Sequence, residues 1–232
     1  DVYKRQILSS PHSGLDIPTN IAATMHEEAR TTPDADRRID ELYDFAPSLG
    51  CHYITARYSR YVVDLNRDPQ STPLYADGRK ITGLVPTERF DGEPIYQGEE
   101  PSSEEIERRT KSYYAPYHAR LAELIESVRG RTSRVLLFDC HSIRRNVPSI
   151  SATPFPDLIL GNNEGTTSDP QFLEQAASHL RSAGYQVSLN HPFKGGFITR
   201  HYGNPNEGVH TLQLEMCQDL YLEQGQLDKG IK

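Results

Sequence analysis

The sequence lacks the features of a membrane, exported or nucleic-acid-binding protein. Its 232 residues contain no apolar run that approaches the roughly 20 residues needed to cross a bilayer. No basic segment followed by an apolar core stands at the start, so secretion has no support. The net charge is −7 and no block of Lys and Arg stands out. We therefore expect neither a membrane nor nucleic acid among the partners.

Cysteine is scarce as well. Cys51, Cys140 and Cys217 make an odd number, no CxxC spacing occurs, and each lies in an apolar stretch typical of a strand. We predict buried free thiols, which fit a cytoplasmic protein. The sequence gives no information on the oligomeric state.

The length and the ordinary composition, with 25% charged and 36% apolar residues, suit one catalytic domain over residues 1–232. No internal repeat or low-complexity segment interrupts it. The first residue is not Met, and no completed helix follows Tyr221. We therefore expect packing elements to be missing from both ends.

Strand-like and helix-like segments alternate along the chain. Short apolar runs predict strands over residues 7–10, 52–66 (one or two strands), 135–139, 185–190 and 210–216. Apolar residues at helical spacing predict helices over residues 21–30, 36–49, 103–129 and 170–183. This alternation predicts an α/β fold with a mainly parallel mixed sheet flanked by helices. Residues 68–101 are rich in Pro and Gly and predict a long functional loop or a small cap.

Two histidines follow predicted strands, at the edge where ligands collect in such sheets. His12 follows the strand at 7–10 and His141 follows the strand at 135–139. Two imidazoles and one carboxylate form the ligand set of a catalytic Zn²⁺ site with one position open for water. The alternative is a pair of hydrogen-bonded structural histidines. Imidazole and carboxylate ligands also accept Co, Ni, Mn or Fe.

The third metal ligand stays open at this point. Asp36 and Asp40 are four residues apart on one predicted helix face, so either could reach the metal. Asp36 could equally be a helix-terminal acid favoured by the helix dipole. Asp16 and Asp44 are further candidates.

Residues 60–67, Arg-Tyr-Val-Val-Asp-Leu-Asn-Arg, combine strand alternation with several polar side chains. Arg60 and Asp64 share one strand face, so they could form a structural ion pair, or Arg60 could face the metal and stabilise an oxyanion. Asn66 and Arg67 follow at the strand end and could bind a substrate carboxylate, which a guanidinium group holds in a bidentate manner.

Two later segments carry further candidates. Glu215 lies in a strand so apolar that it needs a partner or a function, and a general base acting on a metal-bound water is such a function. A glycine pair at 195–196 lies between Lys194 and Arg200. Glycine allows close backbone approach to a ligand, and two cations suit a second carboxylate. The alternative is a tight surface loop with solvated charges.

Together these segments resemble the N-formylglutamate amidohydrolase family. The resemblance spans almost the whole chain in the family's order, at residues 10–14 (Ser-Pro-His-Ser-Gly), 40–46 (Asp-Glu-Leu-Tyr-Asp-Phe-Ala), 59–69 (Ser-Arg-Tyr-Val-Val-Asp-Leu-Asn-Arg-Asp-Pro), 139–143 (Asp-Cys-His-Ser-Ile), 193–203 (Phe-Lys-Gly-Gly-Phe-Ile-Thr-Arg-His-Tyr-Gly) and 210–215 (His-Thr-Leu-Gln-Leu-Glu). The family is similar in fold to zinc carboxypeptidases and aspartoacylases.

The resemblance implies a hydrolase acting on a linear amide C–N bond. Its substrate would be a small dicarboxylate, N-formyl-L-glutamate, split into formate and L-glutamate in histidine degradation. It implies that His12, an acidic residue and His141 bind Zn²⁺. Arg60 would donate to the oxyanion and Glu215 would be the general base. The substrate carboxylates would be bound by Asn66 and Arg67, with Lys194 or Arg200.

Three other functions compete with this interpretation. A related enzyme could act on another N-acyl amino acid, and a non-catalytic homologue could bind carboxylates without turnover. A serine hydrolase using Ser13 or Ser142 is less favoured, because no Gly-x-Ser-x-Gly elbow occurs.

Overall fold

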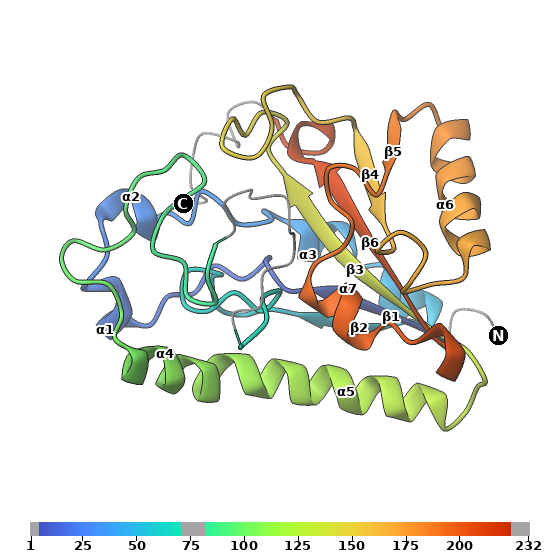
Figure 1. Cartoon of the computed structure of the whole chain (residues 1–232), viewed down its shortest axis with the longest axis horizontal. Helices are drawn as coiled ribbons and strands as arrows, with labels where there is room; N and C mark the ends of the chain where they lie inside the picture. Colours follow the sequence, from blue (N-terminus) through green and yellow to red (C-terminus); the bar gives the residue numbers. More distant parts are fainter. Residues whose placement is uncertain (1–4, 71–81, 224–232) are drawn as a thin grey trace.

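Short apolar segments far apart in the chain form one mixed sheet in the computed structural model, which describes residues 5–70 and 82–223 (Figure 1). The strands are β1 Gln6–Ser10, β2 His52–Thr55, β3 Val135–Ile143, β4 Leu158–Gly161, β5 Val187–Leu189 and β6 Val209–Cys217. Their order is β2-β1-β3-β6-β4-β5. The first four in this order are parallel, β4 is antiparallel to β6, and β5 is parallel to β4. The predicted mainly parallel mixed sheet is confirmed.

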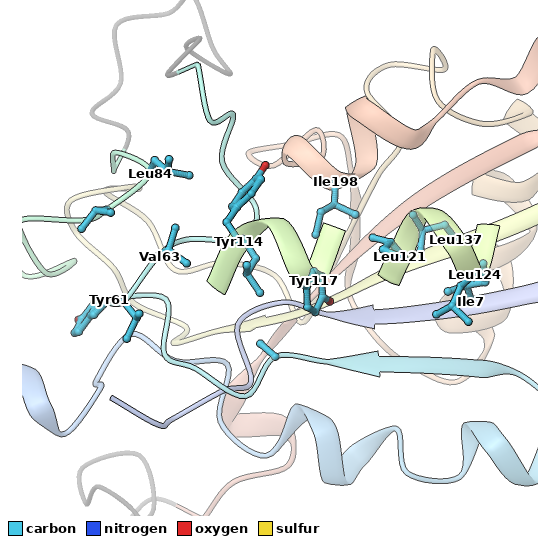
Figure 2. Packing of buried hydrophobic residues seen from close by; sticks show 14 of the residues in the cluster. Ile7, Tyr61, Val63, Leu84, Tyr114, Tyr117, Leu121, Leu124, Leu137 and Ile198 are labelled. Carbon is cyan, nitrogen blue, oxygen red and sulfur yellow. The ribbon is translucent and has the colours of Figure 1, made fainter. Parts of the chain in front are cut away.

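Helices cover both faces of this sheet. They are α1 Thr19–Ala22, α2 Glu27–Arg30, α3 Ile39–Leu42, α4 Ser103–Arg109, α5 Ala115–Arg129, α6 Pro170–Ser182 and α7 Phe197–Tyr202, with 3₁₀ turns η2 Ala46–Leu49, η4 Pro205–Glu207 and η5 Gln218–Leu220. On one face, Leu137 of β3 packs with Leu121 of α5 and Ile198 of α7 (Figure 2). On the other face, Leu160 of β4 packs with Leu173 of α6. The sheet is therefore the middle layer of three.

The helix predicted over residues 103–129 is present as α4, the π-helical turn η3 Thr110–Tyr114, and α5 (Figure 1). Ser102 caps its start, since its hydroxyl oxygen accepts a hydrogen bond from the backbone N–H of Glu105. Three of its side chains hydrogen-bond to backbone oxygens in the segment 61–67: Arg109 to Val62 (3.4 Å), Tyr114 to Arg67 (2.9 Å) and His118 to Leu65 (2.8 Å).

Three sequence predictions need correction. The helix predicted over 21–30 is interrupted, because Met25 forms an isolated β-bridge with Tyr96. The helix predicted over 36–49 reduces to α3 and η2, because Arg38 adopts the left-handed conformation (φ 55°) just before α3. The strand predicted over 52–66 stops at Thr55, and residues 59–66 form turns in which the Asp64 carboxylate accepts the backbone N–H of Asn66 (2.9 Å).

Other expectations concern the cysteines, the long loop and the membrane. All three cysteines are buried free thiols, as predicted. The segment 68–101 lies partly outside the described residues, and its residues 82–101 contain turns and isolated β-bridges such as Glu88 with Pro94. Among the helices that the structure describes, none has the length and apolarity to cross a membrane.

Candidate active site

Residues from three adjacent strands meet at the carboxyl end of the sheet. His12 follows β1, while His141 and Glu215 lie on β3 and β6 and are Cα partners in the parallel register. Asp139 and Gln213 are partners in the same way, two residues earlier. Because residues paired in this way project from the same face, the sheet register brings these side chains to one site.

His12, Asp36 and His141 form a buried group that could hold a metal ion. One ligand atom from each side chain lies within 4.8 Å of the others. Asp36 Oδ2 lies 2.9 Å from Nδ1 of His141 and 3.7 Å from Nδ1 of His12. Asp36 reaches this position through its backbone N–H, which donates to the carbonyl oxygen of His12 at 3.0 Å. Two imidazole nitrogens and a carboxylate oxygen are a suitable donor set for a divalent transition metal.

The far nitrogens of both imidazoles are held by carboxylates. His12 Nε2 lies 2.7 Å from Asp64 Oδ1. His141 Nε2 lies 3.1 Å from Asp139 Oδ2 and 3.0 Å from Asn66 Nδ2, which itself donates to Asp139 Oδ2 at 3.2 Å. A histidine that donates Nε2–H to a carboxylate presents the lone pair of Nδ1, and this is the arrangement that second-layer carboxylates produce around metal-binding histidines. Both rings are therefore oriented with Nδ1 towards Asp36.

The charges in this group support a cation. Burial and the nearby Arg60 guanidinium lower the pKa of His12, which favours the neutral ring that a metal ligand needs. Burial opposes ionisation of Asp36, but the hydrogen bond with His141 and the neighbouring imidazoles outweigh it and lower the Asp36 pKa. Burial also opposes charge on His141, but the Asp139 and Asp36 carboxylates raise its pKa. The Asp36 and Asp139 carboxylates thus favour positive charge beside them, as a bound metal cation would supply.

Arg60 and Asp64 form the ion pair that the sequence suggested. Arg60 Nη2 donates to Asp64 Oδ2 at 2.7 Å, and the guanidinium carbon lies 4.9 Å from the centre of the Phe90 ring. Both charged side chains are buried, and Asp64 also contacts His12. Asp64 thus links the guanidinium to the candidate metal ligand.

Glu215 is buried beside this group. The nearest hydrogen-bond partner found for it in the described part of the chain is Gln213 Nε2, at 3.4 Å. Burial, with the Asp36 and Asp139 charges also raising it, brings its pKa to about 8. A carboxyl group with a pKa near neutrality can both accept and return a proton.

A cavity of about 240 Å³ opens over these residues. Its lining includes the three candidate metal ligands and Glu215, together with Arg60, Asn66 and Arg67. Arg67 donates to the carbonyl oxygen and the hydroxyl of Thr82, at 3.0 and 2.9 Å. The Asn66 amide is fixed by Ile198, whose backbone N–H donates to Asn66 Oδ1 at 2.7 Å. Most of the residues predicted from the sequence therefore share one cavity.

Three predicted residues are not brought to the cavity. Asp40 is exposed on α3 and lies outside the group of potential metal ligands found in the described chain. Lys194 donates to Glu164 Oε1 at 2.8 Å, and Arg200 Nε donates to the carbonyl oxygen of Gly195 at 2.8 Å. Neither cation is among the described residues that line the cavity.

The sequence reasoning missed other residues of the site. Asp139 precedes His141 by two positions in β3, and its alternation with that histidine was the available signal. Arg89 lines the cavity from the segment predicted as loop or cap. Nothing in the sequence indicated that Arg89 belongs to the site, because that segment carries no periodicity.

A three-layer α/β domain with two oriented histidines, a buried aspartate and a buried glutamate in one cavity has the side chains of a hydrolase site that could hold a metal ion. Comparison with known proteins defines the group more closely. The family model described as N-formylglutamate amidohydrolase matches residues 5–222. This chain belongs to that family, as the sequence resemblance predicted.

Relatives of known name support this assignment. The chain is 41% identical to N-formylglutamate deformylase of Pseudomonas putida and 42% identical to that of Pseudomonas aeruginosa, in each case over 94% of this chain and 82% of the relative. The crystal structure of N-formylglutamate amidohydrolase from Ralstonia eutropha superposes with a TM-score of 0.82 at 31% identity, covering 97% of this chain and 85% of the other. A gene product of Agrobacterium tumefaciens shares the fold, with a TM-score of 0.74 at 18% identity over 96% and 84% of the two chains.

Proposed function

We propose that this protein hydrolyses N-formyl-L-glutamate to formate and L-glutamate, with a divalent metal ion, Zn²⁺ in the first instance. The observation that carries the proposal is the single cavity that joins the His12, Asp36 and His141 group to Glu215 and to arginine side chains. The identity to two Pseudomonas N-formylglutamate deformylases gives the same substrate. The reaction would belong to histidine degradation in the cytoplasm.

His12 Nδ1, Asp36 Oδ2 and His141 Nδ1 are the atoms that would hold the metal. When bound, the metal supplies Lewis-acid polarisation of the formyl carbonyl and makes water more acidic. Asp64 and Asp139 keep the two imidazoles in the orientation that this binding needs. The position of His12 and His141 at the carboxyl end of parallel strands also favours a relationship to zinc carboxypeptidases and aspartoacylases.

Glu215 would act as the general base and then as the acid. It accepts a proton from the attacking water and returns it to the amine nitrogen of glutamate as the C–N bond breaks. A metal cation in the neighbouring group would lower the pKa of Glu215 from its value of about 8, which favours the carboxylate form at the start of the cycle.

Arginines would fix the two ends of the substrate. Arg60, held by Asp64, would stabilise the negative charge that develops on the formyl oxygen. Arg67 and Asn66 would bind a carboxylate of the substrate. Arg200 contributes through the backbone of the glycine loop, because it holds the Gly195 carbonyl and the Gly196 N–H donates to Gln213 Oε1 at 2.7 Å, whereas Lys194 pairs with Glu164 at 2.8 Å.

The test is formate release from N-formyl-L-glutamate, measured before chelation, after chelation and after Zn²⁺ is added back. Release that is lost and restored with the metal supports the proposal. Glu215→Gln should lower kcat by roughly 10²- to 10⁴-fold. The matched control Glu123→Gln replaces an exposed glutamate of α5 and should leave kcat unchanged. Release that survives both chelation and Glu215→Gln would overturn the assignment, and faster turnover of an N-acetyl amino acid would redirect it to a related deacylase.

A further inference from the structure

We propose that Arg89 binds the side-chain carboxylate of N-formyl-L-glutamate and thereby sets the preference of the site for acidic amino acids. This inference rests on the function proposed above. A substrate with two carboxylates needs two cationic positions in the cavity. Arg60 is assigned above to the formyl oxygen, and the other arginines among the described residues that line the cavity are Arg67 and Arg89. Arg67 therefore supplies one position and Arg89 can supply the other.

The Arg89 backbone is fixed by a tight turn. Its N–H donates to the carbonyl oxygen of Glu93 at 2.9 Å, and its carbonyl oxygen accepts the N–H of Gly92 at 3.0 Å. Gly92 has φ +88°, which suits glycine. The next residue, Phe90, donates its N–H at 2.8 Å to Asp34, a buried carboxylate. The turn therefore holds Arg89 against the wall of the cavity.

One edge of the Arg89 guanidinium is already held by Asp91. Nε lies 3.0 Å from Asp91 Oδ1, and Nη2 lies 2.9 Å from Asp91 Oδ2. The Asp91 side chain is 48% exposed, whereas that of Arg89 is 13% exposed, and both residues line the cavity. The Nη1 atom of Arg89 has no hydrogen bond to any residue that the structure describes. Arginine can bind a second carboxylate through its Nη1–Nη2 edge while Asp91 fixes the plane of the group.

The pair with Asp91 does not cancel this capacity. Asp91 contacts only Nε and Nη2, so a substrate carboxylate can bind through Nη1 and the second N–H of Nη2 without breaking that pair. The alternative is that Arg89 only stabilises the turn 89–92. The two interpretations differ in one respect: a structural role affects all substrates alike, whereas a binding role depends on the charge of the substrate side chain.

The experiment compares N-formyl-L-glutamate with N-formyl-L-glutamine, its uncharged isostere, in wild type and in Arg89→Gln. We expect Arg89→Gln to lower kcat/KM for N-formyl-L-glutamate by roughly 10- to 100-fold, mainly through KM, because a charge-assisted hydrogen-bond pair is lost. The value for N-formyl-L-glutamine should stay within about twofold, since it does not present a carboxylate to Arg89. Arg89→Lys keeps the charge but not the fork, and should fall between wild type and Arg89→Gln.

Arg57→Gln is the matched control. Arg57 pairs with Asp16 at 2.9 Å on the exposed surface, outside the described lining of the cavity. The Arg57→Gln variant should therefore prefer N-formyl-L-glutamate over N-formyl-L-glutamine as strongly as the wild type does. An equal loss for both substrates in Arg89→Gln, or no loss for either, overturns the proposal. An unchanged preference for glutamate in Arg89→Lys and Arg89→Gln alike does the same.

Failure of the proposed function can be told apart from failure of this inference. If the wild type releases no formate from N-formyl-L-glutamate, the function has failed, and calorimetric binding of glutarate then tests Arg89 directly. Glutarate affinity that drops about tenfold or more in Arg89→Gln, and is unchanged in Arg57→Gln, supports the second carboxylate position. Equal glutarate affinity in wild type and Arg89→Gln, or no binding to either, overturns it.

Discussion

Replacing Asp64 by asparagine separates two consequences of one buried carboxylate. Oδ1 of Asp64 lies 2.7 Å from His12 Nε2, and Oδ2 accepts from Arg60 Nη2 at 2.7 Å. Asparagine keeps the shape but offers one oxygen and one NH₂ group. Whichever way the amide turns, its NH₂ group faces a donor, either the imidazole N–H or the guanidinium. The substitution therefore removes one contact and creates a repulsive one.

The expected magnitudes follow from burial. Asp64 is fully buried and Arg60 is 5% exposed, so Asp64→Asn leaves a buried cation without its partner, at a cost of about 3–5 kcal/mol in the free energy of unfolding. Loss of the carboxylate behind a metal-binding histidine typically weakens metal affinity by roughly 10- to 100-fold. Urea unfolding of the metal-free protein measures the first effect, and Zn²⁺ competition with a chromophoric chelator measures the second.

Asp16→Asn provides the control. Asp16 pairs with Arg57 at the surface, where the two side chains are 57% and 76% exposed, so its loss should cost about 0–1 kcal/mol and leave metal affinity unchanged. Unchanged stability in Asp64→Asn would refute the importance of the Arg60 pair. Wild-type Zn²⁺ affinity in a folded Asp64→Asn variant would show that His12 is not a ligand oriented by Asp64.

Three further outcomes are expected. Gly196→Ala should lower kcat/KM for formate release more than tenfold, because a Cβ at this position would lie 2.4 Å from Asn66 Nδ2. The control Gly98→Ala should have no effect, because a Cβ there meets nothing within 4 Å. Leu121→Ala should cost about 2–5 kcal/mol in urea unfolding, because Leu121 is fully buried in the core under α5, and a loss below 1 kcal/mol would contradict this packing. Burial raises the pKa of Glu215 from 4.5 to about 8, so in the metal-free protein its stabilising contribution is complete below pH 4.5 and is lost as the pH rises to 8. Between pH 5 and pH 8, the free energy of unfolding in urea should therefore fall less for Glu215→Gln than for wild type. An equal fall in the two proteins would refute the raised pKa.

The site residues that could be predicted from the sequence are those placed by strand geometry. His12, His141 and Glu215 lie at or beyond the ends of parallel strands, and a general rule of α/β sheets directs attention there. The choice between Asp36 and Asp40 could not be made in this way. It depends on the left-handed Arg38 and on the hydrogen bond from Asp36 N to the His12 carbonyl, both of which are properties of the folded chain.

The fold shows the same division. Long segments with clear periodicity, such as residues 103–129 and 210–216, are a helix and a strand as predicted. The strand β4, Leu158–Gly161, was not predicted from the sequence. The run 59–66 has strand-like composition, yet the Asp64 side chain binds the backbone N–H of Asn66, and the backbone oxygen of Leu65 binds the His118 side chain of α5. These contacts replace a strand ladder. Local pattern cannot show this, since the partners are far away in the sequence.

The π-helical turn within the long helix has a consequence for residues on both sides of it. Arg109 and Tyr114 are five residues apart, and in a regular α-helix they would point about 140° away from each other. The wider turn over Thr110–Tyr114 brings Arg109 and Tyr114 to the same side, so that both can reach the segment 61–67. One residue more in this turn thus aligns two halves of a helix that would otherwise be out of phase. A deletion of one residue here would rotate α4 relative to α5 and separate Arg109 from the segment that ends in Asn66 and Arg67.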